Sequence, residues 1–419
     1  MIGLRVRLGV LGLALLTGVS VPTAAASAAP AAGSPTVEER RLDGAVPQEI
    51  LRRSGFDAVA SGFRRDLGRA QSCAQARRIV GREGSALWRR AVERAQGRGP
   101  AGGDLSRDDD RPLYWARLAM TRRLRTWEPS FGLTSRQRQD LLDRLERTSR
   151  GQGDLRFPGR RGLRRVLLTG FDPFTLDRDV RISNPSGASA LALDGTVIET
   201  ERGPARVEAA VFPVRWRDFD EGTVERTLRP YLPRADLFAT VSQGRVGRFD
   251  VERTNGAWRG GFPDNDGVSR TGPVPVADPA TRPQWTGTTL PYAAIAAART
   301  GPFPVHDHTE VTEIPAGAVD PVVRPDGPTP GSTARAGAGG DYLSNEIAYR
   351  ATLLRDRLGL HGLPGGHVHT PVLQFGAGNT DPATGAVTDP EFVRNRLGII
   401  GQVRSIVAVA LGAAGRGRG

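Results

Sequence analysis

Residues 164–174 have the sequence Arg-Arg-Val-Leu-Leu-Thr-Gly-Phe-Asp-Pro-Phe, and this stretch decides the fold. The apolar run from Arg165 to Thr169 is short and is ended by Gly170, a pattern that is typical of a buried β-strand. Ligand sites in parallel sheets lie beyond the carboxyl ends of the strands. We therefore expect Gly170 to Phe174 to lie at a strand end and to contribute to a binding site.

The segments that follow alternate between helix and strand patterns. Asn184-Pro185-Ser186 predicts a helix start, because proline is tolerated in the first helical turn. A second strand is expected over residues 207–214, a second helix over 219–231 and a third strand over 237–241. This alternation predicts an α/β fold with a mostly parallel sheet and helices on both faces. We assign this domain to residues 163–412.

Residues 37–150 have only helical patterns. Apolar side chains recur there at spacings of three and four and are separated by arginines, and a glycine-rich linker follows at residues 97–103. We expect these apolar and tryptophan side chains to form a core rather than ligand contacts. The sequence therefore predicts a small all-α region in front of the sheet, packed on itself or on the second domain, and assigns it no function.

The beginning of the chain resembles a targeting segment. Two arginines precede an apolar run from Leu8 to Val21, and Ala26-Ser27-Ala28 offers a small-residue cleavage site. We predict a signal peptide at residues 1–28 and a tether at residues 29–36, and hence a secreted or extracytoplasmic protein. The alternative is an uncleaved membrane anchor. No other stretch is expected to approach the length of a membrane span.

The composition sets limits on partners. A chain of 419 residues is long enough for two folded units. All 58 basic residues are arginine and are scattered among 45 acidic ones, so the net charge of +13 indicates a solvated basic surface rather than a nucleic-acid partner. Cys73 is the only cysteine, which excludes an intrachain disulfide. We expect it to be a small buried hydrophobic residue.

Three residues of the second half could carry hydrolytic chemistry. Hydrolysis of an amide needs a nucleophile, a base and a carboxylate that orients the base. Ser344 begins a predicted amphipathic helix, where it could be a plain N-cap or a nucleophile favoured by the helix dipole. His369 lies on an alternating strand and is the candidate base. Glu252 is either the orienting carboxylate or a surface partner of Arg248 or Arg253.

The histidines leave a second alternative open. His367 and His369 share one face of their predicted strand, and His306 and His308 form another alternating pair. Four imidazoles could bind zinc, but no carboxylate or cysteine at a fixed spacing accompanies them. Histidines with structural partners are the commoner case. We therefore expect no metal and no cofactor.

Short motifs in the second half follow one another in a distinctive order. They are Gly170-Phe171-Asp172-Pro173-Phe174, Gln243-Gly244 with Glu252-Arg253, Pro263-Asp264-Asn265-Asp266-Gly267, Thr289-Leu290-Pro291, Tyr342-Leu343-Ser344-Asn345 and His369-Thr370-Pro371. This order resembles pyroglutamyl peptidase I, a family that removes an N-terminal pyroglutamate with a Cys–His–Glu triad. The resemblance covers about residues 164–403.

The resemblance implies a role for individual residues. Ser344 stands at the position of the catalytic cysteine, His369 at that of the base and Glu252 at that of the carboxylate. The implied partner is a peptide that begins with pyroglutamate. The implied substrate-binding residues, whose aromatic members enclose the pyroglutamyl ring in the family, are Phe171, Phe174, Gln243 and Leu343.

The departures from the family pattern lead to two hypotheses. Besides the serine, Glu346 replaces a common histidine, the family's arginine aligns with Gly261, and residues 300–340 are a Pro/Gly-rich insertion. Arg259 is the nearest candidate to fill the space of that arginine. One hypothesis is a secreted pyroglutamyl-peptidase-like hydrolase. The other is an inactive relative that binds peptide termini or a partner through the retained pocket. We prefer the hydrolase because the ring pocket and two triad members are kept.

Overall fold

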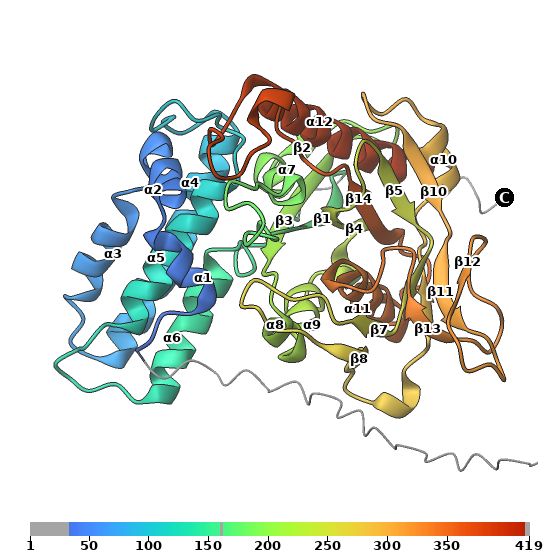
Figure 1. Cartoon of the computed structure of the whole chain (residues 1–419), viewed down its shortest axis with the longest axis horizontal. Coiled ribbons are helices and arrows are strands. Elements are labelled where there is room, and N and C mark those ends of the chain that lie inside the picture. The colour runs from blue at the N-terminus through green and yellow to red at the C-terminus, as the bar shows by residue number, and fades with distance from the viewer. Residues whose placement is uncertain (1–32, 160–161, 415–419) are drawn as a thin grey trace, which may run out of the picture.

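The computed structural model describes residues 33–159 and 162–414. The predicted signal peptide and the first part of the tether lie outside these residues. Figure 1 shows a helical region on one side of the molecule, packed against a second part that contains a sheet with helices on both faces.

The helical region contains helices and short turns only. Within residues 33–159 the structure has no strand, so the all-α prediction is confirmed. The predicted apolar side chains, among them Ile50, Trp88 and Trp115, are buried in a common core. The helices are α1 (Val37–Arg40), α2 (Ala45–Ser54), α3 (Val59–Leu67), α4 (Cys73–Ala95), α5 (Arg111–Arg125) and α6 (Ser135–Thr148).

Cys73 does not lie in this core. It is the first residue of α4, directly after the capping Ser72, and its side chain is half-buried. The prediction of a buried hydrophobic residue was wrong, because the buried face of this helix begins only at Ala76.

The second part is built on a seven-stranded sheet in the order β10-β5-β14-β4-β1-β3-β2. Its four central strands run parallel, whereas β2 is antiparallel to β3 and the parallel pair β5–β10 runs against β14. The α/β prediction is confirmed. The strands are β1 (Arg164–Phe171), β2 (Val197–Ile198), β3 (Ala205–Phe212), β4 (Leu237–Gln243), β5 (Phe249–Glu252), β10 (Val305–His308) and β14 (Gly365–Thr370).

Helices cover both faces of this sheet (Figure 1). On one face α7 (Pro185–Leu193) and α12 (Pro390–Ala413) pack on side chains such as Val166 and Val368. On the other face α8 (Trp216–Asp220), α9 (Thr223–Leu228) and α11 (Leu343–Arg357) pack on Leu167 and Phe238. The alternation of strand side chains between two faces thus divides the core into two layers. The remaining helix, α10 (Tyr292–Ala297), lies beside α12 and β10.

One predicted helix is split. The segment expected as a single helix over 219–231 forms α8 and α9, separated by Gly222 with φ of 72°. A left-handed residue cannot continue an α-helix, so Gly222 ends one helix and starts the other.

The Pro/Gly-rich insertion at residues 300–340 is ordered. It contains β10 and a three-stranded antiparallel sheet of β11 (Val311–Ile314), β12 (Val322–Arg324) and β13 (Thr333–Ala336). Two small two-stranded sheets lie beside it. They are formed by β6 (Thr254–Gly256) with β9 (Trp285–Gly287) and by β7 (Trp258–Gly260) with β8 (Thr271–Pro273). Single 3-10 turns are Arg41–Asp43, Leu232–Arg234, Pro279–Thr281 and Ala377–Asn379.

One further expectation is corrected by α12. Among the described residues, this helix has the length and apolar composition of a membrane span, although no second span was expected. Half of its most apolar stretch is buried inside the protein, where it packs on α7 and α10. The core helices of folded domains have the same apolar composition as membrane spans. The sequence pattern alone does not show that α12 is buried.

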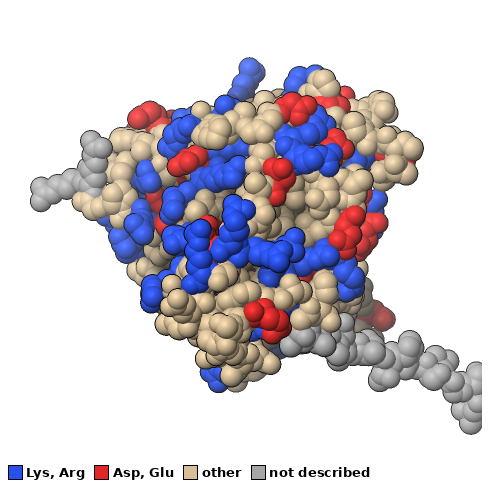
Figure 2. All heavy atoms as spheres, turned by 90° about the vertical axis from the view of Figure 1, so that its left-hand side faces the viewer, with Lys and Arg blue, Asp and Glu red and all other residues tan. Residues whose placement is uncertain are grey.

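The surface of the helical region is rich in arginine. Figure 2 looks onto this side of the molecule, where arginines form a broad band interrupted by single acidic residues. Exposed arginines of α3 and α4, such as Arg64, Arg65, Arg77 and Arg78, contribute to the charge of this region. Oppositely charged neighbours, as in the Arg82–Asp66 pair, reduce the local field.

Candidate functional site

A small apolar cavity lies at the carboxyl ends of β1 and β4. Its volume is about 70 Å³, which suits a small ring rather than a large side chain. All four predicted substrate-binding residues and Ser344 belong to its wall. The lining residues are Phe171, Phe174, Asn184, Val214, Ser242, Gln243, Tyr342, Leu343 and Ser344.

Aromatic rings form two sides of the cavity. The Phe171 ring, which is 3% exposed, stacks on Phe219 with ring centroids 6.3 Å apart. Phe174 lies 6.3 Å from Tyr342, whose ring also contacts Trp216 at 5.3 Å. Phe171 therefore belongs both to the core and to the cavity wall, whereas Phe174 and Tyr342 form its outer rim.

Ser344 is the second residue of α11 and not its N-cap. Tyr342 occupies the cap position and makes no side-chain cap bond, so the N-cap alternative for Ser344 was wrong. The Ser344 hydroxyl donates to the carbonyl oxygen of Gly339 at 3.2 Å. The expected amphipathic pattern is also wrong. The large sheet covers one side of α11 and the two-stranded sheets cover another, so most of its residues are buried.

His369 and Glu252 are joined directly. Nδ1 of His369 lies 2.6 Å from Oε1 of Glu252, and both side chains are buried. Glu252 is not in a surface turn, because it ends β5, which runs antiparallel to β14 and pairs Asp250 with His369. The neighbouring arginines bind elsewhere: Arg248 pairs with Asp250 and Arg253 with Asp307. Thus the surface-pair alternative for Glu252 was wrong.

His308 is a site residue that the sequence did not single out. Its Nδ1 lies 2.8 Å from Oε2, the second carboxylate oxygen of Glu252. Burial alone would raise the pKa of Glu252, but the hydrogen bonds from His308 and His369 lower it to about 2. The pairing of β10 with β5 sets His308 opposite Glu252. The alternating His306/His308 pattern was the available signal, but it was weighed only as part of a zinc alternative that was set aside.

His367 has separate partners. Its Nδ1 lies 2.8 Å from the hydroxyl oxygen of Thr240 and its Nε2 lies 2.8 Å from that of Ser242. Complete burial lowers its pKa well below the usual value, so the ring is neutral. His306, two residues before His308 on β10, is exposed. Among residues 33–159 and 162–414 no group of three or more ligating side chains is placed to hold a metal ion.

Two glycines bring His369 into this site. A side chain at Gly244 would lie 2.6 Å from Cβ of His369, so the turn after β4 needs a glycine there. A side chain at Gly339 would lie 3.3 Å from Cε1 of His369. Gly339 therefore touches the imidazole and also accepts the hydrogen bond of Ser344, which places both residues beside one turn.

The arginine expected near the substrate is engaged elsewhere. Arg259 forms a bidentate pair with Glu346, with both bonds at 2.6 Å, and its guanidinium also binds Asp220. Its guanidinium carbon lies 4.9 Å from the Trp216 ring. Glu346, which replaces the family's histidine, thus holds Arg259 against the helix and not in the cavity. The catalytic and substrate-binding roles implied by the resemblance remain predictions.

Comparisons with known proteins divide the chain at the same place as the fold. Residues 20–146 match the family model of the PA0049 N-terminal domain, and residues 165–281 and 303–374 match that of the PA0049 C-terminal domain. The uncharacterized protein PA0049 of Pseudomonas aeruginosa is 34% identical over 491 aligned residues, which cover 88% of each chain.

Solved structures give a weaker likeness. Two mutant pyrrolidone carboxyl peptidases from Pyrococcus furiosus match with 22% identity and a TM-score of 0.39, covering 59% of this chain and 98% of theirs. The pyrrolidone carboxyl peptidase from Thermococcus litoralis matches with 21% identity and a TM-score of 0.38, covering 59% and 93%. The match to both domain models and to a full-length relative is the decisive one, and the chain belongs to the PA0049 family.

Proposed function

We propose that this protein is a hydrolase that removes an N-terminal pyroglutamyl group from peptides. The observation that carries the proposal is the buried His369–Glu252 pair beside a small cavity whose wall includes Ser344. The aromatic and apolar lining suits a five-membered lactam ring, and Gln243 adds a side-chain amide for recognition of the lactam amide.

The proposed chemistry uses the His369–Glu252 hydrogen bond and needs the Ser344 hydroxyl to turn from the Gly339 carbonyl toward Nε2 of His369. Glu252 accepts the Nδ1–H of His369, which leaves Nε2 as the base. His369 takes the Ser344 proton as Oγ attacks the pyroglutamyl carbonyl carbon, and then gives that proton to the leaving amine. Water hydrolyses the resulting ester by the same two steps. First-turn amides of α11 have no acceptor within the helix and are available to the oxyanion.

A serine nucleophile is consistent with an exported protein, and we include secretion in the proposal. A thiolate would be open to oxidation outside the cytoplasm, whereas a hydroxyl is not. The N-terminal sequence of the mature protein, isolated from the culture medium or periplasm, tests this part. A chain that stays in the cytoplasm with residues 1–28 intact would contradict secretion.

The test of the activity uses a pyroglutamyl amide of a fluorogenic amine and the purified protein. Ser344→Ala and His369→Ala should each lower kcat by at least about a thousandfold, because triad members act as a unit. Cys73→Ala is the control and should retain activity. Iodoacetamide should have no effect on the wild type. Activity that survives Ser344→Ala excludes Ser344 as the nucleophile.

The alternative, an inactive relative that binds pyroglutamyl termini, is favoured by one contact. The Ser344 hydroxyl donates its proton to Gly339 and must turn away from that carbonyl before it can transfer it to His369. For an inactive relative, the wild type should bind L-pyroglutamate in calorimetry without cleaving the amide. Ser344→Cys should then restore turnover, because a thiol is far more acidic than a hydroxyl. Phe171→Ala should weaken binding in either case.

A further inference from the structure

The helical region is bound to the loops that form the cavity. Three loops receive a buried charged side chain from residues 37–150: the loop after β1, the segment before α7, and the loop at residues 262–268. Two of these loops contain cavity-lining residues, and the third is bonded to the loop after β1. The region's polar contacts therefore converge on one side of the site.

The loop after β1 is held through Asp172. Arg117 of α5 donates to one carboxylate oxygen of Asp172 at 2.5 Å, and Arg150, just after α6, donates to the other at 2.9 and 3.0 Å. All three side chains are buried. Asp172 stands in the chain between the two wall residues Phe171 and Phe174, so these ion pairs fix the backbone that carries both rings.

The segment before α7 is held through Asp110. Its carboxylate accepts the backbone N–H of Asn184 at 3.0 Å and the hydroxyl of Ser183. Asn184 lines the cavity, and its side-chain amide donates to the carbonyl oxygen of Asp172 at 2.9 Å. The two loops are thus connected to each other as well as to the helices.

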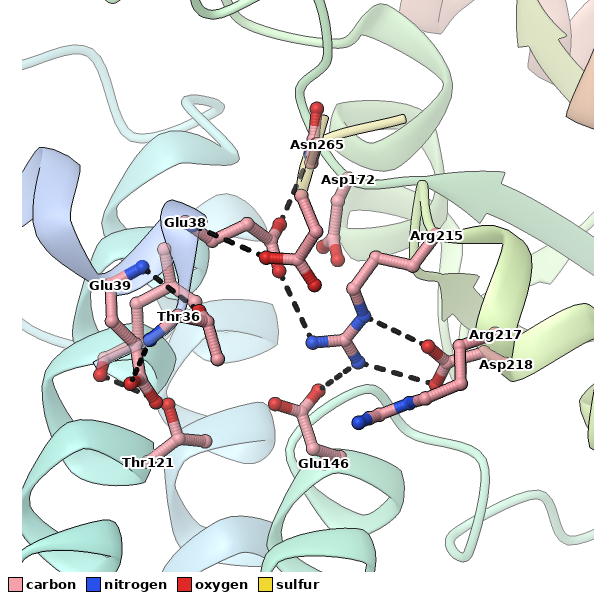
Figure 3. A network of polar contacts seen from close by, with 12 residues as sticks. Thr36, Glu38, Glu39, Thr121, Glu146, Asp172, Arg215, Arg217, Asp218 and Asn265 are labelled. Atoms are coloured by element: carbon pink, nitrogen blue, oxygen red, sulfur yellow. Dashed lines mark hydrogen bonds and ion pairs between the residues drawn. The ribbon is translucent and has the colours of Figure 1, made fainter. Parts of the chain in front are cut away.

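Glu38 of α1 holds the third loop and is the centre of the network in Figure 3. Its Oε1 accepts from the Asn265 amide at 3.1 Å and from the Tyr114 hydroxyl at 2.9 Å, while its Oε2 accepts from Arg215 at 3.1 Å. The same Asn265 amide donates to the carbonyl oxygen of Pro173 at 2.8 Å. Asn265 therefore joins the loop at 262–268 to the loop after β1, and Glu38, which is 1% exposed, binds that amide to the helical region.

We propose that the helical region is a positioning element of the pyroglutamyl pocket and that Glu38 is the residue through which it positions the loop at 262–268. The identity of the ligand rests on the proposed function, whereas the contacts between the helical region and the loops are independent of it. A buried carboxyl group is tolerated only when its hydrogen-bond partners are in place, so these contacts favour one arrangement of the loops. A pocket fixed before the ligand arrives avoids the entropy cost of ordering loops on binding.

A matched pair of variants tests the proposal in the full chain. Glu38→Gln replaces one carboxylate oxygen by an NH2 group that cannot accept a hydrogen bond. At least one of the donors Asn265, Tyr114 and Arg215 then loses its acceptor. Glu39→Gln, the control, makes the same change in the same turn at the same 1% exposure, but the side chain of Glu39 binds only Arg125 and the Thr36 amide within the helical region. Hydrogen exchange should become at least about tenfold faster at residues 262–268 in Glu38→Gln and stay unchanged in Glu39→Gln. Equal exchange in both variants overturns the proposal.

The second measurement is kinetic. Glu38→Gln should raise KM for the pyroglutamyl amide about tenfold and change kcat less than about twofold, because the loop affects binding and not the reacting atoms. An unchanged KM in Glu38→Gln overturns the proposal. If Glu38→Gln does not fold, Asn265→Ala breaks the same contact from the loop side and should give the same result. A wild type that neither cleaves nor binds pyroglutamyl compounds contradicts the proposed function alone, and the exchange experiment still decides the role of Glu38.

Discussion

The carboxylate of Glu252 has an imidazole on each of its two oxygens. Both histidines contact the carboxylate through Nδ1. The Nε2 atom of each ring therefore does not bind Glu252. Nδ1 can donate only if it carries the ring proton, which fixes the tautomer of His369 that the proposed reaction needs. His308 therefore affects the base without touching the substrate, through the orientation and the charge of Glu252.

His308→Ala should lower kcat/KM by about 10- to 100-fold, the range found when a partner of a positioned histidine system is removed. The pKa of Glu252 should rise from about 2 because one of its two donors is lost. The base His369 must also be unprotonated for activity, so this shift is measured on the carboxylate itself, by an NMR pH titration of the Glu252 side-chain carbonyl. The pH profile of this resonance should move to higher pH in His308→Ala.

The matched control for this prediction is His306→Ala, on the same strand but exposed. It should leave the profile unchanged. His308→Asn should restore part of the activity, since its amide can reach the position of Nδ1. Identical profiles for wild type and His308→Ala would falsify the role of His308.

Gly244→Ala tests how closely the turn after β4 fits His369. The added methyl group would lie 2.6 Å from Cβ of His369, so the imidazole must move away from Glu252. We expect a loss of about 100-fold in kcat, because misplacement of a reacting group by about 1 Å has this effect, together with a loss of stability of about 1–3 kcal/mol from overpacking. Gly378→Ala, where a methyl group has open space, is the control. Kinetics like those of the wild type would contradict the fit.

At the scale of elements, the sequence predicted what depends on local pattern. The buried strands β1, β3 and β4 were found because parallel strands are continuous apolar runs. The burial of β5 was missed, since its four residues include two acids, and one of them, Glu252, meets its partners only through the pairing of β5 with β14 and β10. Such pairings join segments more than 50 residues apart, and a local sequence pattern does not predict them.

The same limit applies to the candidate site. The family resemblance named five of the nine residues that line its cavity, namely Phe171, Phe174, Gln243, Leu343 and Ser344. The second imidazole on Glu252 could not be predicted, because it depends on the parallel pairing of β10 with β5. The burial of α11 could not be predicted either, since helical periodicity does not show that the small sheet of β6 and β9 covers the polar side of the helix.

Glu346 shows how α11 accommodates charge on its buried side. It binds Arg259 at 2.6 Å and Arg350 at 2.7 Å, and it is fully buried. Glu346→Ala leaves two guanidinium groups without this partner and should lower the free energy of unfolding by about 3–5 kcal/mol. Chemical denaturation measures the change. Glu225→Ala, which removes the more exposed partner of Arg350, should lower it by less than about 1 kcal/mol. Equal losses for the two variants would contradict this argument.

At the scale of the whole molecule, the two parts of the chain share one interior. The apolar cores of the helical region and of one sheet face are continuous. The backbone N–H of Val211, in β3, donates to the carbonyl oxygen of Arg150 at 2.9 Å, and the Trp88 indole donates to Asp194 at 3.1 Å. The helices are therefore built into the fold rather than appended to it.

This shared interior makes stability depend on pH. Burial raises the pKa of Asp110 to about 7, and the nearby Asp109 carboxylate adds to the shift. A folded pKa above the unfolded value means that the folded state holds the proton more tightly. The contribution of Asp110 is thus fully present below its unfolded pKa, near 3.8, and is lost as the pH rises through about 7.

Asp110→Asn removes this titration while keeping the hydrogen bonds, because its amide can donate to the Ser183 hydroxyl and its oxygen can accept from Asn184. Relative to wild type, the variant should gain stability between pH 5 and pH 8 by on the order of 3 kcal/mol. Denaturation midpoints at the two pH values measure it. Parallel pH profiles for the two proteins would show that Asp110 does not titrate in this range.

The pairing of Arg117 and Arg150 with Asp172 has a consequence for biosynthesis. The ribosome completes residues 37–150 before it makes Asp172, Arg215 or Asn265. Until then the helices contain arginines and Glu38 that cannot be buried in a dry interior without their partners. The nascent helices should therefore stay loosely packed and sensitive to proteases, and both halves should become resistant together, when the last pocket loop has emerged.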